Sequence, residues 1–146
     1  MKSRNLLFLT FLIVFGHPAA AQRITGSWKR TGNMLVNADG SKNDLQKTIV
    51  QSMPCSAGVK YIFEEGGKHY TKSPKGCEMI DEISTATWTQ TGNTLSIHSN
   101  AENDIGTVYT LSFSGNTVVF THVYSEAEKS RLHIKTAKII ITYQRV

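Results

Sequence analysis

Three short turns that contain glycine divide much of this chain into pairs of alternating segments. The turns lie at residues 66–67 (Gly-Gly), 92–93 (Gly-Asn) and 115–116 (Gly-Asn), and apolar and polar side chains alternate on both sides of each. A two-residue Gly-Asn loop favours a type II′ hairpin, because glycine adopts the positive φ that its first position requires. Alternation with a period of two is typical of a strand with one buried face. The turns therefore predict a series of antiparallel hairpins.

Each two-residue turn also predicts which side chains face one another across the hairpin. The expected pairs are Phe113 with Val118, Leu111 with Phe120, Tyr109 with His122, Gln90 with Leu95, Trp88 with Ile97, Glu65 with Lys68, and Phe63 with Tyr70. In every hairpin the large apolar residues share one face, whereas a slip of one residue would move them among polar side chains. Turn chemistry and patterning therefore predict the same antiparallel meander.

About eight segments read as strands, and they are rich in Thr, Val, Ile and aromatic residues. They lie at residues 24–36, 59–64, 68–72, 85–91, 94–99, 107–114, 117–124 and 138–146. Successive short hairpins favour an up-and-down barrel over a sandwich, which usually needs Greek-key crossovers. Barrel closure also removes the exposed sheet edges. We therefore predict an all-β chain that forms an eight-stranded antiparallel up-and-down barrel with at most one or two short helices.

Two segments between the expected strands have the pattern of a helix start. Residues 41–44 (Ser-Lys-Asn-Asp) resemble a capping box, and apolar residues follow at every fourth position. This segment could equally be an irregular loop. Ser125 and Glu128 form a second capping pattern, for which we expect a long hairpin tip or a single helical turn.

The first residues have the layout of a secretory signal peptide. Lys2 and Arg4 precede residues 6–15, which are apolar except for one Thr, and residues 19–21 (Ala-Ala-Ala) provide small side chains before Gln22. The alternative is a membrane anchor, but a helix needs about 20 apolar residues to cross the bilayer. No Cys lies near the cleavage point, so a lipoprotein is not expected.

The mature chain predicted in this way, residues 22–146, is long enough for one domain. About 125 residues bury roughly two-thirds of their unfolded surface. Removal of Lys2 and Arg4 from the 16 basic residues leaves 14 against 11 acidic ones. Both signs are interleaved along the chain, so we expect a solvated surface and no nucleic-acid partner. The protein is expected to be secreted or periplasmic, with no membrane span in the mature chain.

Cys55 and Cys77 are the two cysteines of the chain. In an oxidising compartment an isolated even pair is expected to form a disulfide. The alternative is a metal site, but two thiols 22 positions apart with no nearby CxxC lack the spacing of zinc ligands. The histidines contain no pair at i, i+2 or i, i+4, so we expect neither a metal nor a cofactor.

The order of these features resembles a known family of small barrels. Residues 24–29 (Ile-Thr-Gly-Ser-Trp-Lys) look like the Gly-x-Trp motif that opens the first strand of lipocalins. Bacterial lipocalin-like domain proteins have a longer series of motifs in a fixed order. The series consists of a Cys, a strand ending in Phe, a glycine turn, a second Cys, a strand with Thr-Trp, a Gly-Asn turn and a strand that starts with Thr-Leu. The corresponding parts of this chain are Cys55, residues 61–63, residues 66–67, Cys77, residues 87–88 and residues 92–95, and residues 141–146 fit the family's last strand.

This resemblance implies a secreted barrel that binds a small, mostly apolar molecule, without naming that molecule. It also implies an Arg from late in the chain that stacks on the Trp of the first strand. We expect Arg145 to lie over Trp28, with a cation–π contribution of about 0.5–1 kcal/mol. The long, charged stretch at residues 125–138 departs from the family, whose shorter members have a tight turn there.

The common inward face of the hairpins supplies the candidate ligand-binding residues. They are Tyr61, Phe63, Trp88, Tyr109, Leu111, Phe120 and His122. An eight-stranded barrel has room either for a filled interior or for one cavity, and both possibilities stay open. A cavity lined by aromatic rings with a few hydroxyls suits a flat apolar ligand with one or two polar groups. His122 is the ionisable residue of this face, and a protein neighbour could equally satisfy its ring nitrogens.

The leading hypothesis is a non-catalytic barrel that binds a small, mostly apolar ligand in its interior. The alternative is a protein-binding or inhibitor module that uses the loops at residues 37–54 and 125–135. An enzyme that acts inside the cavity is a third hypothesis. The chain has no Gly-x-Ser-x-Gly motif, and a buried pair of a carboxylate and a histidine would favour that hypothesis.

Overall fold

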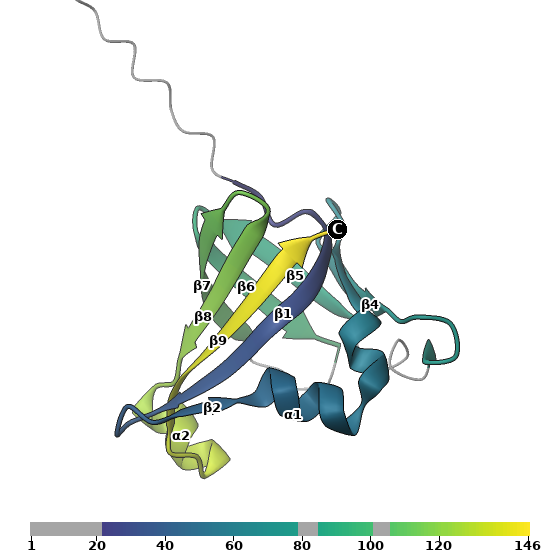
Figure 1. Ribbon diagram of the computed structural model, residues 1–146. Helices are drawn as coiled ribbons and strands as arrows, with labels where there is room; N and C mark the ends of the chain where they lie inside the picture. Colours follow the sequence, from purple (N-terminus) through teal and green to yellow (C-terminus); the bar gives the residue numbers. More distant parts are fainter. Residues whose placement is uncertain (1–21, 79–84, 101–105) are drawn as a thin grey trace, which may run out of the picture.

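A computed structural model describes residues 22–78, 85–100 and 106–146 of the chain; the predicted signal peptide, residues 1–21, lies outside them. The strands are β1 (Gly26–Asn37), β2 (Lys42–Asp44), β3 (Lys60–Phe63), β4 (Lys68–Lys72), β5 (Ala86–Thr91), β6 (Thr94–Ser99), β7 (Thr107–Ser114), β8 (Thr117–Val123) and β9 (Thr136–Arg145). The helices are α1 (Leu45–Ser52), the 3-10 helix η1 (Pro54–Gly58) and α2 (Glu126–Leu132) (Figure 1).

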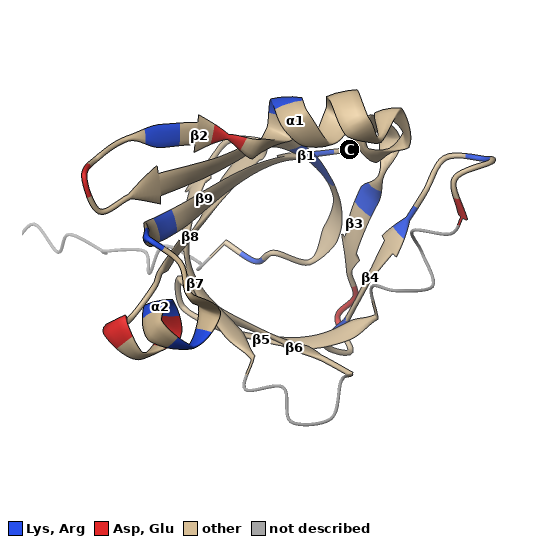
Figure 2. Cartoon of the chain, turned by 90° about the horizontal axis from the view of Figure 1, so that it is seen from below, with Lys and Arg blue, Asp and Glu red and all other residues tan. Residues whose placement is uncertain are grey.

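The strands form one antiparallel sheet that closes on itself. β1 pairs with β3, each later strand pairs with the next, and β9 returns to pair with β1. Figure 2 shows the resulting ring, with α1 outside β1 and α2 beside β7 and β8. The predicted eight-stranded up-and-down barrel with two short α-helices is confirmed. The short strand β2 pairs with the second half of β1 and leads into α1.

The two Gly-Asn hairpins have the predicted register. Trp88 pairs with Ile97 between β5 and β6, and Leu111 pairs with Phe120 between β7 and β8. Ala86 and Trp88 of β5 are buried, whereas the threonines that alternate with them are exposed. The period-two pattern of the sequence therefore separates the inner face of the barrel from the outer face.

The register predicted for the β3–β4 hairpin is wrong by one residue. Phe63 pairs with His69 instead of Tyr70. The turn holds three residues, 65–67, because the N–H of Glu64 donates to the carbonyl of Lys68 at 2.9 Å. One additional loop residue moves every later side chain to the opposite face. Tyr70 therefore leaves the predicted inward set, and His69 takes its place.

Both candidate helices form, with some differences from the prediction. α1 is capped by Asp44, whose side chain accepts a hydrogen bond from the N–H of Lys47 at 3.2 Å. The expected capping box of Ser125 and Glu128 is present, but α2 is seven residues long instead of a single turn. No helix in the described ranges has the length and apolar composition that would let it cross a membrane.

The predicted disulfide is confirmed. Cys55 in η1 and Cys77, which follows β4, are joined with their Cα atoms 6.0 Å apart. The bond connects the segment before β3 to the segment after β4. It therefore links the two ends of this hairpin.

One end of the barrel is sealed by the chain that precedes β1. Ile24 is completely buried, and its N–H donates to Oε1 of Gln90 at 2.9 Å. Trp28, which is 1% exposed, donates its indole N–H to the carbonyl of Ile24 at 2.6 Å. The guanidinium carbon of Arg145 lies 4.4 Å from the centre of a Trp28 ring, and its Nη1 donates to the carbonyl of Thr25 at 3.1 Å. The expected stacking of Arg145 on Trp28 is confirmed.

Candidate functional site

The predicted aromatic residues come together inside the barrel. The ring of Phe120 lies 6.1 Å from Phe63, 5.5 Å from Tyr109 and 4.8 Å from Tyr143, measured between ring centroids. Phe63 meets Trp88 edge-on at 5.8 Å. Strands far apart in the sequence therefore contribute to one continuous aromatic wall.

The inward side chains are not buried to the same extent. Phe63, Leu111 and Phe120 are at most 2% exposed and form the centre of the core. Other hydrophobic side chains pack against this core but are only partly buried: Tyr61, Ile97, Tyr109, Phe113 and Ile139. The core thus continues into an apolar surface that a small molecule could contact.

Four polar side chains on the inner face form a group that we call the inner polar cluster: Arg30, Asn33, Tyr61 and Tyr143. Arg30 of β1 pairs with Tyr143 of β9, and its guanidinium carbon lies 5.6 Å from the centre of the Tyr61 ring. The rings of Tyr61 and Tyr143 meet edge-on at 5.0 Å. Asn33 pairs with the buried Ile141. Of these four residues, the sequence prediction contained only Tyr61.

A β-bulge in β1 places Arg30 and Asn33 on the same face. The register with β9 shifts between Arg30 and Gly32. Without an extra residue, positions 30 and 33 would face opposite sides, because strand side chains alternate with a period of two. A Cβ atom at Gly32 would lie 3.3 Å from the side chain of Thr142. Glycine therefore suits the close approach of β1 and β9 at this bulge.

The cluster combines one positive charge with two neutral phenols. Burial raises the pKa of Tyr143 far above its usual value, and nearby Tyr61 adds to this shift while Arg30 opposes it. Burial also raises the pKa of Tyr61, again against the effect of Arg30. Both hydroxyls therefore keep their protons at neutral pH and can donate hydrogen bonds.

Asn33 has unused hydrogen-bonding capacity inside the protein. The residue is 7% exposed, and its side-chain oxygen is buried without a hydrogen-bond partner among the described residues. A buried polar atom without a partner costs about 1–3 kcal/mol. An unpaired polar atom on the same strand face as a half-buried Arg is a reason to consider this position as part of a binding site.

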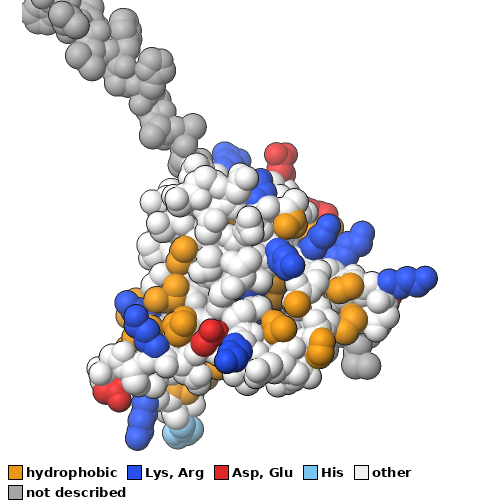
Figure 3. Space-filling model, in the orientation of Figure 1, with side chains coloured by type: hydrophobic (Ala, Val, Ile, Leu, Met, Phe, Trp, Pro, Cys, Tyr) orange, Lys and Arg blue, Asp and Glu red, His pale blue; other side chains and the backbone are white. Residues whose placement is uncertain are grey.

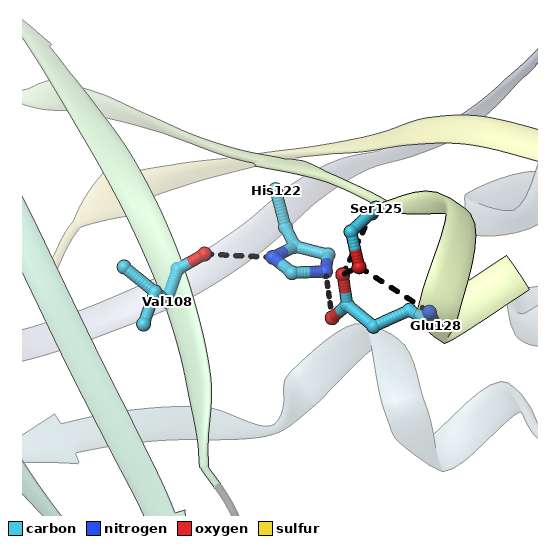
Figure 4. A network of polar contacts seen from close by, with 4 residues as sticks. All are labelled: Val108, His122, Ser125 and Glu128. Carbon is cyan, nitrogen blue, oxygen red and sulfur yellow. Dashed lines mark hydrogen bonds and ion pairs between the residues drawn. The ribbon is translucent and has the colours of Figure 1, made fainter. Parts of the chain in front are cut away.

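His122, a candidate from the sequence, has two protein partners (Figure 4). Its Nδ1 lies 2.7 Å from the carbonyl oxygen of Val108, and its Nε2 lies 3.0 Å from Oε1 of Glu128. The other carboxylate oxygen of Glu128 accepts bonds from the N–H and the Oγ of Ser125, both at 2.7 Å. The Ser125 bonds hold the pKa of Glu128 below its usual range, and His122 contributes less to this shift. The network attaches α2 to β8.

The pair of His122 and Glu128 is the kind of arrangement that would favour an enzyme. Each ring nitrogen of His122 already faces an acceptor, and Glu128 also caps α2. Both ring nitrogens of His122 therefore have protein partners, and the pair connects α2 to β7 and β8. Within the described ranges, no group of three or more His, Cys, Asp or Glu side chains could hold a metal ion.

A second concave region lies outside the barrel, between α1 and the outer face of β1 and β9. This groove has a volume of about 630 Å³. Its apolar walls are formed by Met34, Val36, Val50 and Ile140, and Lys42 and Lys47 also line it. Figure 3 shows hydrophobic side chains in patches over the lower half of this face, between Lys and Arg side chains.

Comparisons with protein-family models, curated proteins and solved structures found no match to this chain. The closed eight-stranded antiparallel barrel is consistent with the lipocalin-like fold that the sequence resembles. With no relative to indicate a function, the chemistry of the residues described above is the basis for assigning one.

Proposed function

We propose that this protein is a non-catalytic binding barrel that takes up a small, mostly apolar molecule in its interior. The observation that supports this function is the inner aromatic face, which is continuous with the core but only partly buried at Tyr61, Ile97 and Tyr109. Contact with this face would contribute about 25 cal/mol for each Å² of apolar surface removed from water. A few convergent polar groups beside an apolar surface are typical of small-molecule sites.

We also propose that the protein is a secreted or periplasmic member of the bacterial lipocalin-like group. The N-terminal layout, the resemblance of the strand motifs and the bond between Cys55 and Cys77 support this assignment. Edman sequencing of protein secreted by its own host tests it, and the expected first residue is Gln22. An N-terminus at Met1 in mature protein would contradict the proposal.

Titration with N-phenyl-1-naphthylamine tests the binding function. This neutral dye fluoresces in apolar surroundings, and we expect one dye molecule per barrel. Ile97 is a partly buried side chain of the inner face, so Ile97→Trp should block binding. Thr89 is exposed and pairs with Ser96 on the adjacent strand, so Thr89→Trp adds the same ring on the outside and should leave binding unchanged.

Thermal melting of both variants separates a blocked cavity from a damaged fold. If the interior has room, Ile97→Trp should melt close to the wild type. In a filled core the larger ring would cost about 1–3 kcal/mol through overpacking. Absence of dye binding to the wild type, together with such destabilisation, would contradict the proposed function. Ile139→Trp, on the other side of the inner face, provides an independent second variant.

The alternative function is a protein-binding or inhibitor module, and the groove beside α1 is the observation that favours it. The two loops predicted for this role also expose large apolar side chains, since Met53 is 51% exposed and Leu132 is 49% exposed. Apolar surface of this kind is common at protein interfaces. Protein binding becomes the better supported of the two functions if the dye experiment shows that the barrel interior is filled.

A further inference from the structure

Arg30 places a positive charge on the inner face of a largely apolar barrel. Its Nε donates to Oε1 of Gln46 in α1 at 2.9 Å, and the guanidinium lies over the ring of Tyr61. A guanidinium has five N–H donors in a fixed fork, and the bond to Gln46 uses one of them. No carboxylate in the described part of the chain forms an ion pair with Arg30. A half-buried charge with no counter-ion favours an anion brought by a ligand.

The neighbours of Arg30 suit an anion better than a cation. Tyr61 and Tyr143 remain protonated, so their hydroxyls can donate hydrogen bonds to a negatively charged oxygen. Asn33 adds an amide whose oxygen is buried without a partner, and rotation of this amide exchanges its acceptor oxygen for its donor nitrogen. None of the four residues in the cluster is acidic.

We propose that the inner polar cluster binds an anionic group, a carboxylate or a phosphate monoester, at the end of an otherwise apolar ligand. This inference rests on the proposed function and adds the chemical class of the ligand to it. Arg30 supplies the charge, the two phenols and Asn33 supply hydrogen bonds, and the apolar part lies against the partly buried side chains of Ile97 and Tyr109. The bond to Gln46 makes Gln46 a positioning residue for the guanidinium.

Competition against the neutral dye measures this preference directly. Dodecanoate and methyl dodecanoate have the same acyl chain, but only the first is charged at pH 7.5. We expect dodecanoate to displace half of the bound dye at a concentration at least about tenfold lower, because charge-assisted hydrogen bonds are about twice as strong as neutral ones. Dodecyl phosphate in the same assay distinguishes a phosphate monoester from a carboxylate as the preferred group.

Two substitutions of neighbouring residues assign the preference to the inner face. Arg30→Gln should bring the two half-displacing concentrations to within about twofold and leave displacement by the ester unchanged. Lys29 is the preceding residue of β1 and is exposed, so Lys29→Gln removes the same charge on the outside and should keep the preference. Tyr143→Phe keeps the aromatic ring and loses one hydroxyl, so it should reduce the preference even if Arg30→Gln does not fold.

The outcomes distinguish this inference from the function on which it rests. Equal displacement by dodecanoate and its ester in the wild type would overturn the anion site while leaving the binding barrel intact. A preference that survives both Arg30→Gln and Tyr143→Phe would also overturn it. If the wild type binds no dye and no dodecanoate, the proposed function fails and the anion site fails with it.

Discussion

Replacement of Trp28 by alanine would remove the side chain that connects the sealed end of the barrel to its core. Trp28 is 1% exposed. It donates a hydrogen bond to the carbonyl of Ile24 at 2.6 Å and lies under the guanidinium of Arg145 at 4.4 Å. Trp28→Ala would eliminate the buried ring surface, this hydrogen bond and the stacked cation together.

We expect Trp28→Ala to lower the free energy of unfolding by about 3–5 kcal/mol, the usual range for a large buried aromatic side chain. The hydrogen bond to Ile24 accounts for about 1 kcal/mol. The stacked Arg145 accounts for about 0.5–1 kcal/mol. Lost apolar burial and the remaining cavity account for the rest. Trp28→Phe keeps a buried ring, so it should cost less than Trp28→Ala.

Urea denaturation followed by circular dichroism and by the fluorescence of Trp88 measures this loss. Trp88 is the second of the two Trp residues in the chain, so it still reports unfolding after Trp28 is removed. Lys29→Ala changes the adjacent, exposed residue and should alter the stability by no more than about 0.5 kcal/mol. A loss below about 1 kcal/mol for Trp28→Ala would refute the argument that this indole seals the barrel.

Three further predictions concern the disulfide, the β3–β4 turn and α2. Reduction of the bond between Cys55 and Cys77 should add the mass of two hydrogen atoms and lower the free energy of unfolding by about 3 kcal/mol, measured by urea denaturation with and without reductant. Gly67 has φ +79°, and a Cβ atom added to it would lie 3.0 Å from a backbone oxygen, whereas a Cβ atom at Gly66 would meet open space. Gly67→Ala should therefore lower the free energy of unfolding by about 1–2 kcal/mol, and Gly66→Ala should lower it much less, as measured by urea denaturation. The pKa of Glu128 is lowered in the folded state, so the ionised carboxylate stabilises the fold. This stabilisation is present above the usual glutamate pKa of about 4.3, and it is lost as the pH falls through the lowered pKa. Glu128→Gln should reduce this acid-dependent loss, measured as urea midpoints between about pH 6 and pH 3.

The hairpin registers were predictable where the loop length was unambiguous. At residues 92–93 and 115–116 a Gly-Asn pair separates segments whose apolar residues agree with only one register. At residues 64–67 (Glu-Glu-Gly-Gly) the chain can form a loop of two or three residues. The adjacent His69 and Tyr70 are both aromatic, so the apolar pattern does not decide which of them faces inward.

The aromatic part of the candidate site was predictable, whereas its polar part was not. Strand alternation alone places Phe63, Trp88 and Phe120 on one inner face. Arg30 and Asn33 share that face because of a bulge, and a charged residue within an alternating segment normally indicates the solvent side. Gly32 was the sequence feature that could have indicated this bulge, since glycine inside a strand often marks one.

The sealed end of the barrel and the inner polar cluster lead to opposite expectations for stability. At the sealed end, the indole N–H of Trp28 and a guanidinium nitrogen of Arg145 both have carbonyl partners. In the inner polar cluster, the buried oxygen of Asn33 has no partner in the described part of the chain, and an unpaired buried atom lowers stability. Asn33→Leu replaces the amide with an apolar group of similar shape.

We therefore expect Asn33→Leu to raise the free energy of unfolding by about 1 kcal/mol, because the unpaired polar atom is removed and the side-chain volume is retained. If the Asn33 amide takes part in ligand binding, the same substitution should weaken the preference for dodecanoate over its ester. Substitutions that stabilise a protein at a functional site commonly reduce its function. Urea denaturation and dye displacement on one preparation measure both effects. Destabilisation together with an unchanged preference would mean that the Asn33 amide supports the fold and takes no part in ligand recognition.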